Sequence, residues 1–376
     1  MYGVSGPTLV LVAGATETAA IDGISAAGAD PTLRRHTPSA DLEIVADGRP
    51  GPDSPVPVSP SGCPTPAVVT RAVRELVGVE FAGVDAGLAV PAAPAEATVR
   101  DADAAPGGDI RSAEPVPDAT GVFERARGLA GTIAGVGGDG KGAGGDPAEL
   151  LVAETVPGGT TTALGVLTAL GERPVVSSSL AANPLARKRA VVEEGLAASG
   201  LGPGDAAGDP LGAVRLMGDP VLAAAAGLVV GAVERGVPVT LAGGTQLATV
   251  AALARHAGVE RRLPLATTAF VADDPTADVA ALADDLDLAL TATDPGFGAS
   301  DRPAMRAYAR GEAKEGVGMG GALALADRAG VSDAALRERV AAVTDRLLAE
   351  RGGEAGAATE ATGAAGATGQ HGGDGP

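Results

Sequence analysis

The sequence predicts an α/β protein with a doubly wound, mostly parallel sheet of the Rossmann type, helices on both faces and a smaller helical N-terminal lobe. Two observations support this prediction. From residue 150 onward, short apolar strands alternate with helical segments, an order typical of parallel sheets covered by helices. Glycine-rich turns follow several of these strands, and ligands of such sheets bind outside the carboxyl ends of the strands.

The N-terminal part is less regular. Residues 8–14 form an apolar run that predicts the first strand. The Pro-, Gly- and Ser-rich residues 47–66 predict a long surface loop, and residues 66–78 predict a helix that begins with proline and is closed by glycine. Residues 92–118 predict an elaborated loop with strand fragments at best. The Gly/Asp-rich residues 135–146 predict a mobile segment.

Beyond residue 150 the expected elements alternate regularly and form a core at about residues 150–330. Strands are expected at 150–153, 174–177, 237–241, 265–271 and 288–291. Helices are expected at about 160–170, 184–198, 220–235, 245–256 and 275–286.

The chain ends in a helix and a tail. The helix is expected at about residues 332–350, with Ser332 as its N-cap. Residues 351–376 are a low-complexity Gly/Ala/Thr stretch that predicts disorder. We therefore expect a single domain over residues 1–350, with an N-terminal lobe at about 1–130.

Acidic residues outnumber basic ones along the chain. The 47 Asp and Glu residues against 28 Lys and Arg residues give a formal net charge of −19. A nucleic-acid partner requires a basic surface, and an anionic membrane repels an acidic one, so we expect neither partner. An acidic excess with very few lysines suits a high-salt cytoplasm, where dense ions screen the repulsion among carboxylates.

Cysteine and histidine usage bears on disulfides and metals. The single cysteine, Cys63, excludes an internal disulfide framework and a cysteine-cluster metal site. The three histidines are far apart and have no metal-ligand spacing, so we expect no metal. The first residues lack a basic signal region, and the longest apolar run, residues 221–233, is too short to span a bilayer. We therefore expect a soluble, cytoplasmic protein.

The first motif that could carry chemistry is VPGGTTT at residues 156–162, between an expected strand and an expected helix. Backbone N–H groups at a helix N-terminus bind anions, so the candidates for holding a phosphate or carboxylate are Gly158, Gly159, Thr160 and Thr161. The motif is neither a Walker A loop, since no lysine follows the second glycine, nor the dinucleotide fingerprint GxGxxG. A tight turn capped by threonine is the alternative explanation.

Glu154 lies four residues before Gly158, at the carboxyl end of the expected strand. A carboxylate beside an anion site suits chemistry in which it meets a developing positive charge or fixes a hydroxyl group or ring nitrogen. The alternative is a surface carboxylate that the dipole of the following helix favours.

The second motif is KEGVGMGG at residues 314–321, which runs into a helix of small residues. Its alternating glycines allow unusual backbone angles and remove side-chain walls, which leaves Glu315 facing the adjacent space. If that space is closed and apolar, the pKa of the carboxyl rises toward the range of a general base. A flexible loop with an incidental acid is the alternative.

Two further turns fall at carboxyl edges of the expected strands. The segment LAGGTQ at 241–246 contributes Gly243, Gly244 and Thr245, and the segment DPGFG at 294–298 forms another turn. Taken singly, each is an ordinary turn between a strand and a helix. Their gathering on one side of one sheet indicates a shared site.

Together these motifs resemble those of the nicotinate-nucleotide–dimethylbenzimidazole phosphoribosyltransferase family, in particular its archaeal branch. The resemblance rests on Glu154 with PGGTTTAL at 157–164, AGGTQ at 242–246 and EGVGMGG at 315–321. The segments IDGISAAG at 21–28 and HTPSAD at 36–41 also look like that branch. The resemblance covers about residues 8–330.

The resemblance implies transfer of the 5-phosphoribosyl group of nicotinate mononucleotide to 5,6-dimethylbenzimidazole or a related base, in assembly of the lower ligand of cobamides. Glu315 then matches the family's general base, Glu154 a second acidic residue, and residues 158–161 the loop that holds the 5′-phosphate. Further nucleotide-binding candidates are Gly243, Gly244, Thr245, Gly316 and Gly318. The resemblance also implies a homodimer without cofactor or metal. The chain departs from the family at Phe297, where the family has a histidine.

Two other hypotheses stay open on sequence grounds. The first is a different nucleotide-using α/β enzyme, a hydrolase or ligase, which a magnesium requirement would favour. The second is a non-catalytic protein that binds a nucleotide or a ribazole-like ligand. Tight binding without turnover would support that second hypothesis.

Overall fold

The computed structural model describes residues 6–26, 31–51, 54–59, 61–136 and 147–365. Its centre is one seven-stranded sheet in the order β3-β2-β1-β4-β5-β6-β7, and every pairing in the sheet is parallel. The strands are β1 (Thr8–Ala13), β2 (Glu80–Asp85), β3 (Thr98–Asp101), β4 (Leu150–Thr155), β5 (Val239–Ala242), β6 (Leu263–Thr268) and β7 (Leu288–Thr293). The predicted doubly wound α/β fold is confirmed.

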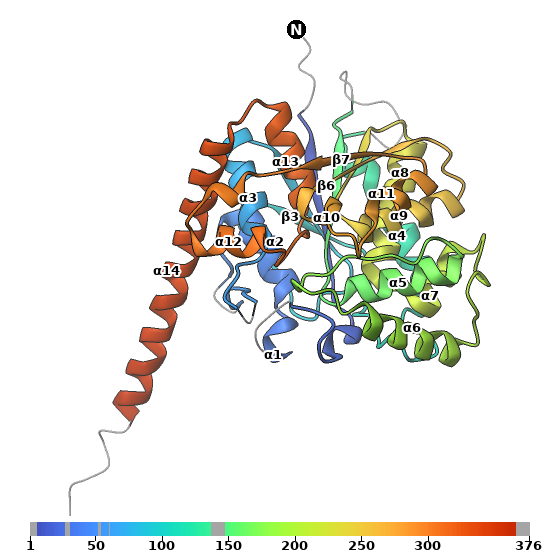
Figure 1. Cartoon of the computed structure of the whole chain (residues 1–376), viewed down its shortest axis with the longest axis horizontal. Coiled ribbons are helices and arrows are strands. Elements are labelled where there is room, and N and C mark those ends of the chain that lie inside the picture. The colour runs from blue at the N-terminus through green and yellow to red at the C-terminus, as the bar shows by residue number, and fades with distance from the viewer. Residues whose placement is uncertain (1–5, 27–30, 52–53, 60, 137–146, 366–376) are drawn as a thin grey trace, which may run out of the picture.

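Helices lie on both sides of the sheet (Figure 1). One side holds α2 (Thr37–Asp47), α3 (Ala67–Val77), α12 (Pro303–Ala309), α13 (Met319–Arg328) and α14 (Asp333–Ala365). The other side holds α4 (Ala119–Ile133), α5 (Gly159–Leu170), α6 (Leu185–Ser199), α7 (Pro210–Met217), α8 (Pro220–Glu234) and α9 (Thr245–His256). The short elements are η1 (Glu17–Ala20), α1 (Pro31–Arg34), α10 (Ala269–Ala272), α11 (Val279–Asp285) and η2 (Phe297–Ala299). In the described part of the chain, no helix is both long and apolar enough to cross a membrane.

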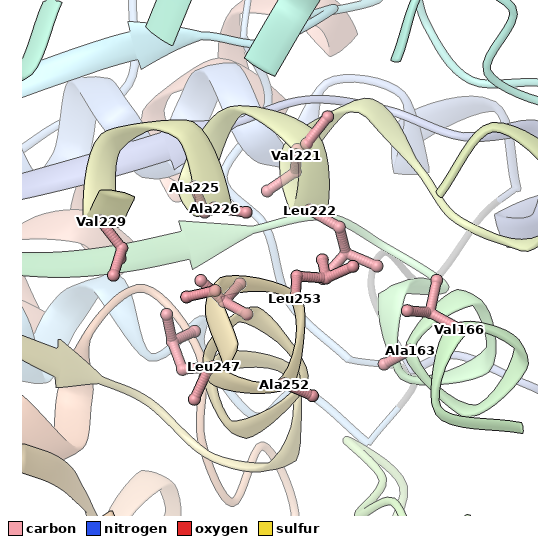
Figure 2. Close-up of a cluster of buried hydrophobic side chains, with 14 of the residues drawn as sticks. Ala163, Val166, Val221, Leu222, Ala225, Ala226, Val229, Leu247, Ala252 and Leu253 are labelled. Atoms are coloured by element: carbon pink, nitrogen blue, oxygen red, sulfur yellow. The ribbon is translucent and has the colours of Figure 1, made fainter. Parts of the chain in front are cut away.

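The central strands are apolar on both faces because helices cover both. In β1, Val10 and Val12 belong to the core under α5, α8 and α9, whereas Leu9 and Leu11 belong to the core under α2, α3 and α13. This division follows the two-residue period of a strand. Figure 2 shows the first core, where side chains of α5, α8 and α9 meet. Its packing fixes α5 and α9, whose N-termini reach the carboxyl edge of the sheet.

The prediction of a strand at 174–177 is wrong. This segment joins no strand, because both edges of β4 are already paired, with β1 and with β5. It lies instead beside the start of α9, where the backbone N–H of Ser177 donates to Thr245 Oγ1 at 3.0 Å. The expected strand at 265–271 also ends early, at Thr268, because the hydroxyl of Thr268 caps α10.

Several elements were not expected from the sequence. The helix α2 is buried over nearly its whole length, so it lacks the polar face that an amphipathic pattern requires. The strand β3 is a short edge strand within the loop expected at 92–118. The helix α14 continues to Ala365, into the segment expected to be disordered, where alanine and glutamate favour a helix. Most of the mobile segment expected at 135–146, and residues 366–376, lie outside the described residues.

Candidate active site

A cavity lies at the carboxyl edge of the sheet, near the ends of β1 and β4. From β1 the sheet continues through β2 and β3 in one direction, and from β4 it continues through β5, β6 and β7 in the other. A doubly wound sheet binds its ligands where the strand order reverses in this way. The cavity measures about 940 Å³, including space open to solvent. Its walls come from the loops after β4 and β5, from the segment 313–317, and from the loop that precedes α3.

One end of the cavity is formed by two helix N-termini. Gly158 caps α5 with a φ of 82° and Gly244 caps α9, and both line the cavity together with Gly159, Thr160 and Thr245. The first N–H groups of a helix have no acceptor within the helix, and the helix dipole favours negative charge there. This end of the cavity therefore suits an anion, as the sequence predicted for Gly158, Gly159 and Thr160, and Gly244 and Thr245 lie there as nucleotide-binding candidates.

Gly158 is required by both its backbone angle and its surroundings. Its positive φ is one that side chains rarely adopt. A Cβ atom at this position would lie 2.9 Å from the backbone of Ala19. Only glycine lets the start of α5 approach η1 this closely.

A buried lysine supports the anion end from behind. Lys188 of α6 is fully buried, and its Nζ donates to Thr160 Oγ1 at 2.8 Å and to the carbonyl oxygen of Ser177 at 2.7 Å. Burial, followed by the charge of Lys314, lowers the pKa of Lys188 to about 7. Because Thr160 accepts from an ammonium group, its own hydroxyl hydrogen is free to be donated to a ligand.

Glu315 lines the cavity just beyond the start of α9 and is held by four donors. Its Oε1 accepts from the N–H groups of Gly316 at 3.1 Å and Gly320 at 2.9 Å. Its Oε2 accepts from Thr267 Oγ1 at 3.2 Å and from the N–H of Thr268 at 3.1 Å. Burial raises the pKa of this carboxyl to about 7 against the opposite effect of these hydrogen bonds. A fixed carboxylate with this pKa suits a general base at neutral pH.

Glu154, at the end of β4, is a second buried carboxyl on the cavity wall. Its Oε2 accepts from Gln246 Nε2 at 3.1 Å. Burial, together with the nearby carboxyls of Asp219, Glu315 and Asp41, raises the pKa of Glu154 to about 8. Among the described residues, Glu154 thus has one hydrogen-bond donor, whereas Glu315 has four.

Asp41 of α2 brings a third carboxyl to the cavity wall. It is 1% exposed and accepts from Thr65 Oγ1 at 2.6 Å and from Thr155 Oγ1 at 2.7 Å. Burial raises the pKa of Asp41 to about 7 against these two hydrogen bonds.

An ion pair anchors the loop that carries Glu315. Lys314 Nζ and Asp274 Oδ2 are 2.6 Å apart, with side chains 7% and 8% exposed. The carbonyl oxygen of Lys314 also accepts from Thr268 Oγ1 at 2.6 Å, and the N–H of Thr268 donates to Glu315. The pair thus ties the ends of β6 and α10 to the residue beside the candidate base.

Three predicted site residues do not line the cavity. Thr161 is fully buried, and its N–H donates to the carbonyl oxygen of Gly158 at 2.8 Å. The N–H of Gly243 donates to Ala266, and Gly318 caps α13 with a positive φ. The structure places them in the supporting turns. Gly316, in contrast, lines the cavity.

Phe297 lies outside the cavity wall. It is fully buried and packs against Phe270 and Tyr308, with ring centroids 6.2 Å and 5.7 Å away. The departure from the family at this position is therefore accommodated by an apolar core.

Sequence reasoning missed Lys188, and it named Asp41 and Gln246 only as parts of motifs. Lys188 and Asp41 lie on helices away from the glycine turns, whereas Gln246 lies in the first turn of α9, directly after the Gly243–Gly244 turn. One sequence signal could have identified Lys188, namely a charged residue on the same side of a predicted helix as its apolar residues. In α6, Lys188 shares the buried side with Val191 and Val192.

The fold is similar to two solved structures from Thermus thermophilus. The structure of nicotinate-nucleotide–dimethylbenzimidazole phosphoribosyltransferase matches with a TM-score of 0.57 and 18% identity over 88% of this chain and 86% of that one. The structure of CobT matches with a TM-score of 0.52 and 19% identity over 91% and 84%. The chain therefore has the fold of this class of phosphoribosyltransferase, with an anion end and buried carboxyls in its cavity.

Sequence relatives identify the family. The chain is 56% identical over 348 residues to a UPF0284 protein of Halobacterium salinarum, across 92% of this chain and 100% of that protein. It is 39% identical to UPF0284 proteins of Methanothermobacter thermautotrophicus and Methanosarcina mazei, over 89% and 91% of this chain and 91% and 95% of those proteins. The chain belongs to the UPF0284 family of archaeal proteins, which confirms the resemblance predicted from the motifs. No protein-family model matches the chain.

Proposed function

We propose that the protein transfers the 5-phosphoribosyl group of nicotinate mononucleotide to a benzimidazole-type base, releasing nicotinate and forming an α-ribazole 5′-phosphate for cobamide assembly. One observation carries the proposal. A single cavity combines two helix N-termini backed by Lys188 with two carboxyls of raised pKa, Glu154 and Glu315. The likeness to a solved phosphoribosyltransferase of this reaction supports it.

The anion end suits the 5′-phosphate. The N-termini of α5 and α9 supply N–H groups and favourable dipoles, and Thr160 supplies a hydroxyl hydrogen. Lys188 lies behind Thr160 and supplies a buried positive charge. A phosphate dianion next to it would favour the charged form of the lysine, so binding and protonation of Lys188 support one another.

Glu315 is the candidate general base. As one ring nitrogen of the benzimidazole attacks C1′ of the ribose, the bond from C1′ to the nicotinate nitrogen breaks. Nicotinate then leaves with the electron pair of that bond. The proton on the other ring nitrogen passes to Glu315, whose four donors keep the carboxylate in place. Holding both reactants in one cavity contributes on the order of 7–11 kcal/mol in well-oriented cases.

Glu154 has a different role because, in the part of the chain that the structure describes, only Gln246 donates to it, whereas four donors hold Glu315. Burial and the neighbouring carboxyls raise the pKa of Glu154 to about 8. At neutral pH it keeps its proton in the free protein, so it can both donate to and accept from a ribose hydroxyl. The unprotonated oxygen of this carboxyl accepts from the ribose hydroxyl, and its partial negative charge stabilises the oxocarbenium-like ribose that forms as nicotinate departs. The proposal requires no cofactor or metal, and it includes a cytoplasmic homodimer.

The test is a product assay in molar potassium chloride with nicotinate mononucleotide and 5,6-dimethylbenzimidazole, followed by chromatography. Nicotinate and α-ribazole 5′-phosphate are expected in equal amounts. Nucleotide binding without product for several bases would support a non-catalytic binder. Magnesium-dependent breakdown of the nucleotide without α-ribazole 5′-phosphate would favour another nucleotide-using enzyme. Neither binding nor product would contradict the proposal.

Glu315→Gln tests the role of the base. The amide cannot take a proton, so turnover is expected to fall roughly 10²- to 10⁴-fold, the usual contribution of such a group. Binding of nicotinate mononucleotide should stay within about threefold, since the proposed phosphate contacts are backbone N–H groups and Thr160 rather than the carboxyl of Glu315, and glutamine has the same size. Glu193→Gln, an exposed glutamate on α6, is the matched control. Unchanged turnover in Glu315→Gln would remove this residue from the mechanism.

A further inference from the structure

One wall of the cavity is mainly apolar. The loop before α3 contributes Pro57, Val58, Cys63, Pro64 and Pro66 to this wall. Prolines and a valine present flat, rigid surfaces without donors, so the wall suits a planar aromatic group. Ser59, Thr65 and Asp41, which is hydrogen-bonded to Thr65, are the polar side chains beside it, and of these only Asp41 is a carboxyl.

The apolar wall lies beside the loop of Glu315. A Cβ atom at Gly316 would be 3.7 Å from Pro66 Cγ, and Thr70 Oγ1 of α3 donates to the carbonyl oxygen of Val317 at 2.8 Å. Val317 itself lines the cavity. A base placed here has one edge toward Glu315 and its other atoms against the loop before α3.

Asp41 is an unusual wall residue because it is a buried carboxyl paired with neutral groups. Its two partners are the hydroxyls of Thr65 and Thr155, one on each oxygen. No cation contributes to the shift of its pKa. A carboxylate has about four acceptor positions, so each oxygen keeps room for a further donor. A buried carboxyl without a cation is costly, and a ligand that donates to it would offset part of that cost.

We propose that Asp41 is a specificity-determining residue that selects acceptor bases carrying an amino or hydroxyl donor on the ring edge remote from Glu315. The inference rests on the proposed function for the identity of the ligand as a base. It adds a second polar contact, separate from the proton transfer to Glu315. A purely alkylated ring leaves the acceptor positions of Asp41 unfilled, and sites built for a donor discriminate against analogues that lack it.

The experiment compares 5-aminobenzimidazole with 5-methylbenzimidazole, which differ by a donor at nearly constant size. Dissociation constants are measured by calorimetry in molar potassium chloride, in the presence of nicotinate. Wild-type protein is expected to bind the amino base at least tenfold more tightly. Asp41→Leu should bind the two bases equally. Asp41→Asn should keep part of the preference for the amino base, because its amide oxygen still accepts a hydrogen bond. A ratio between two ligands in one preparation does not depend on the fraction of folded protein.

Glu43→Gln is the matched control. Glu43 is also a buried carboxyl on α2, but it accepts from the N–H groups of Gly51 and Ala93 and does not line the cavity. The ratio of the dissociation constants of the two bases should be the same in Glu43→Gln as in wild type. Equal binding of the two bases by wild type, binding of neither, or an unchanged ratio in Asp41→Leu would overturn the inference. If wild type binds both bases with the expected ratio but forms no product, the proposed function fails while the role of Asp41 stands.

Discussion

Burial, not ion pairing, sets the protonation of the carboxyl groups around the cavity. Burial is the first cause of the raised pKa values of Asp41, Glu154, Asp219 and Glu315. None of these four has a basic hydrogen-bond partner among the described residues. At neutral pH the fold thus keeps the proton of Glu154 and part of those of Asp41 and Glu315, which solvent-exposed carboxyls would lose.

The pH dependence of turnover follows from Glu315. Its carboxylate form is the base, and its pKa is about 7 in the free protein. We expect kcat/KM for the base to rise about tenfold per pH unit below that value and to fall again toward pH 8.5, as Glu154 and Lys188 lose the protons that the proposed mechanism requires. Initial rates between pH 5.5 and 8.5 would show this profile. The residual rate of Glu315→Gln should lack this rise, and a wild-type rate that falls across the same range would contradict the assignment.

The residues of the site differ in how far the sequence could predict them. Glu154, Glu315, Gly158 and Thr160 lie in or beside glycine turns after strands, where local sequence determines that a ligand can approach the backbone. Asp41 reaches the cavity only because α2 packs beside the end of β4. Such packing depends on contacts between distant segments, which no local pattern contains.

At the scale of elements, the ion pair of Lys314 and Asp274 holds the Glu315 loop against β6 and α10. Lys314→Met is expected to lower the free energy of unfolding by roughly 1–3 kcal/mol, because Asp274 loses its charged partner and, among the described residues, keeps only the N–H and hydroxyl of Thr276 as donors. Replacing both residues, in Lys314→Met with Asp274→Leu, should recover much of that loss. Urea unfolding of the two single variants and the double variant measures the coupling. Additive losses would show that the pair contributes no coupling.

The turn that begins α5 permits a comparison between two glycines. Gly158 and Gly200 both have positive φ, at 82° and 68°, but only Gly158 has a neighbour within 4 Å of its missing Cβ atom. Gly200→Ala should therefore cost only backbone strain, about 1 kcal/mol. Gly158→Ala should cost more and should also weaken nucleotide binding at least tenfold, since α5 must move from Ala19. Thermal unfolding and calorimetry would measure both effects, and equal behaviour of the two variants would contradict this account.

Elements with one buried face or a clear turn were predictable from the sequence, as with α3, α5 and α9. The segment 174–177 was misread because its apolar residues could not show that β4 and β5 pair directly. The helix α2 was missed because burial on all sides removes the periodic pattern. Both failures arise where tertiary packing, rather than local preference, decides the conformation.

For the molecule as a whole, the net charge of −19 predicts a dependence on salt. Repulsion among carboxylates destabilises the folded chain at neutral pH, and dissolved ions screen it. The melting temperature at pH 7.5 should rise between 0.2 M and 2 M potassium chloride. Near pH 4.5, the isoelectric point of the sequence, the same salt range should have a much smaller effect. Equal salt effects at the two pH values would show that charge repulsion is not the cause.

The position of β1 has a consequence for synthesis of the protein on the ribosome. The first strand to emerge becomes a central strand, and it can pair with β2 soon after residue 85. Its other edge waits for β4, which is made many seconds later at ordinary elongation rates. The cavity waits longer still, since its wall runs from Ile24 to Val317. A nascent chain therefore carries an open edge of β1 until β4 has been made, and it acquires its binding site only after Val317 has left the ribosome.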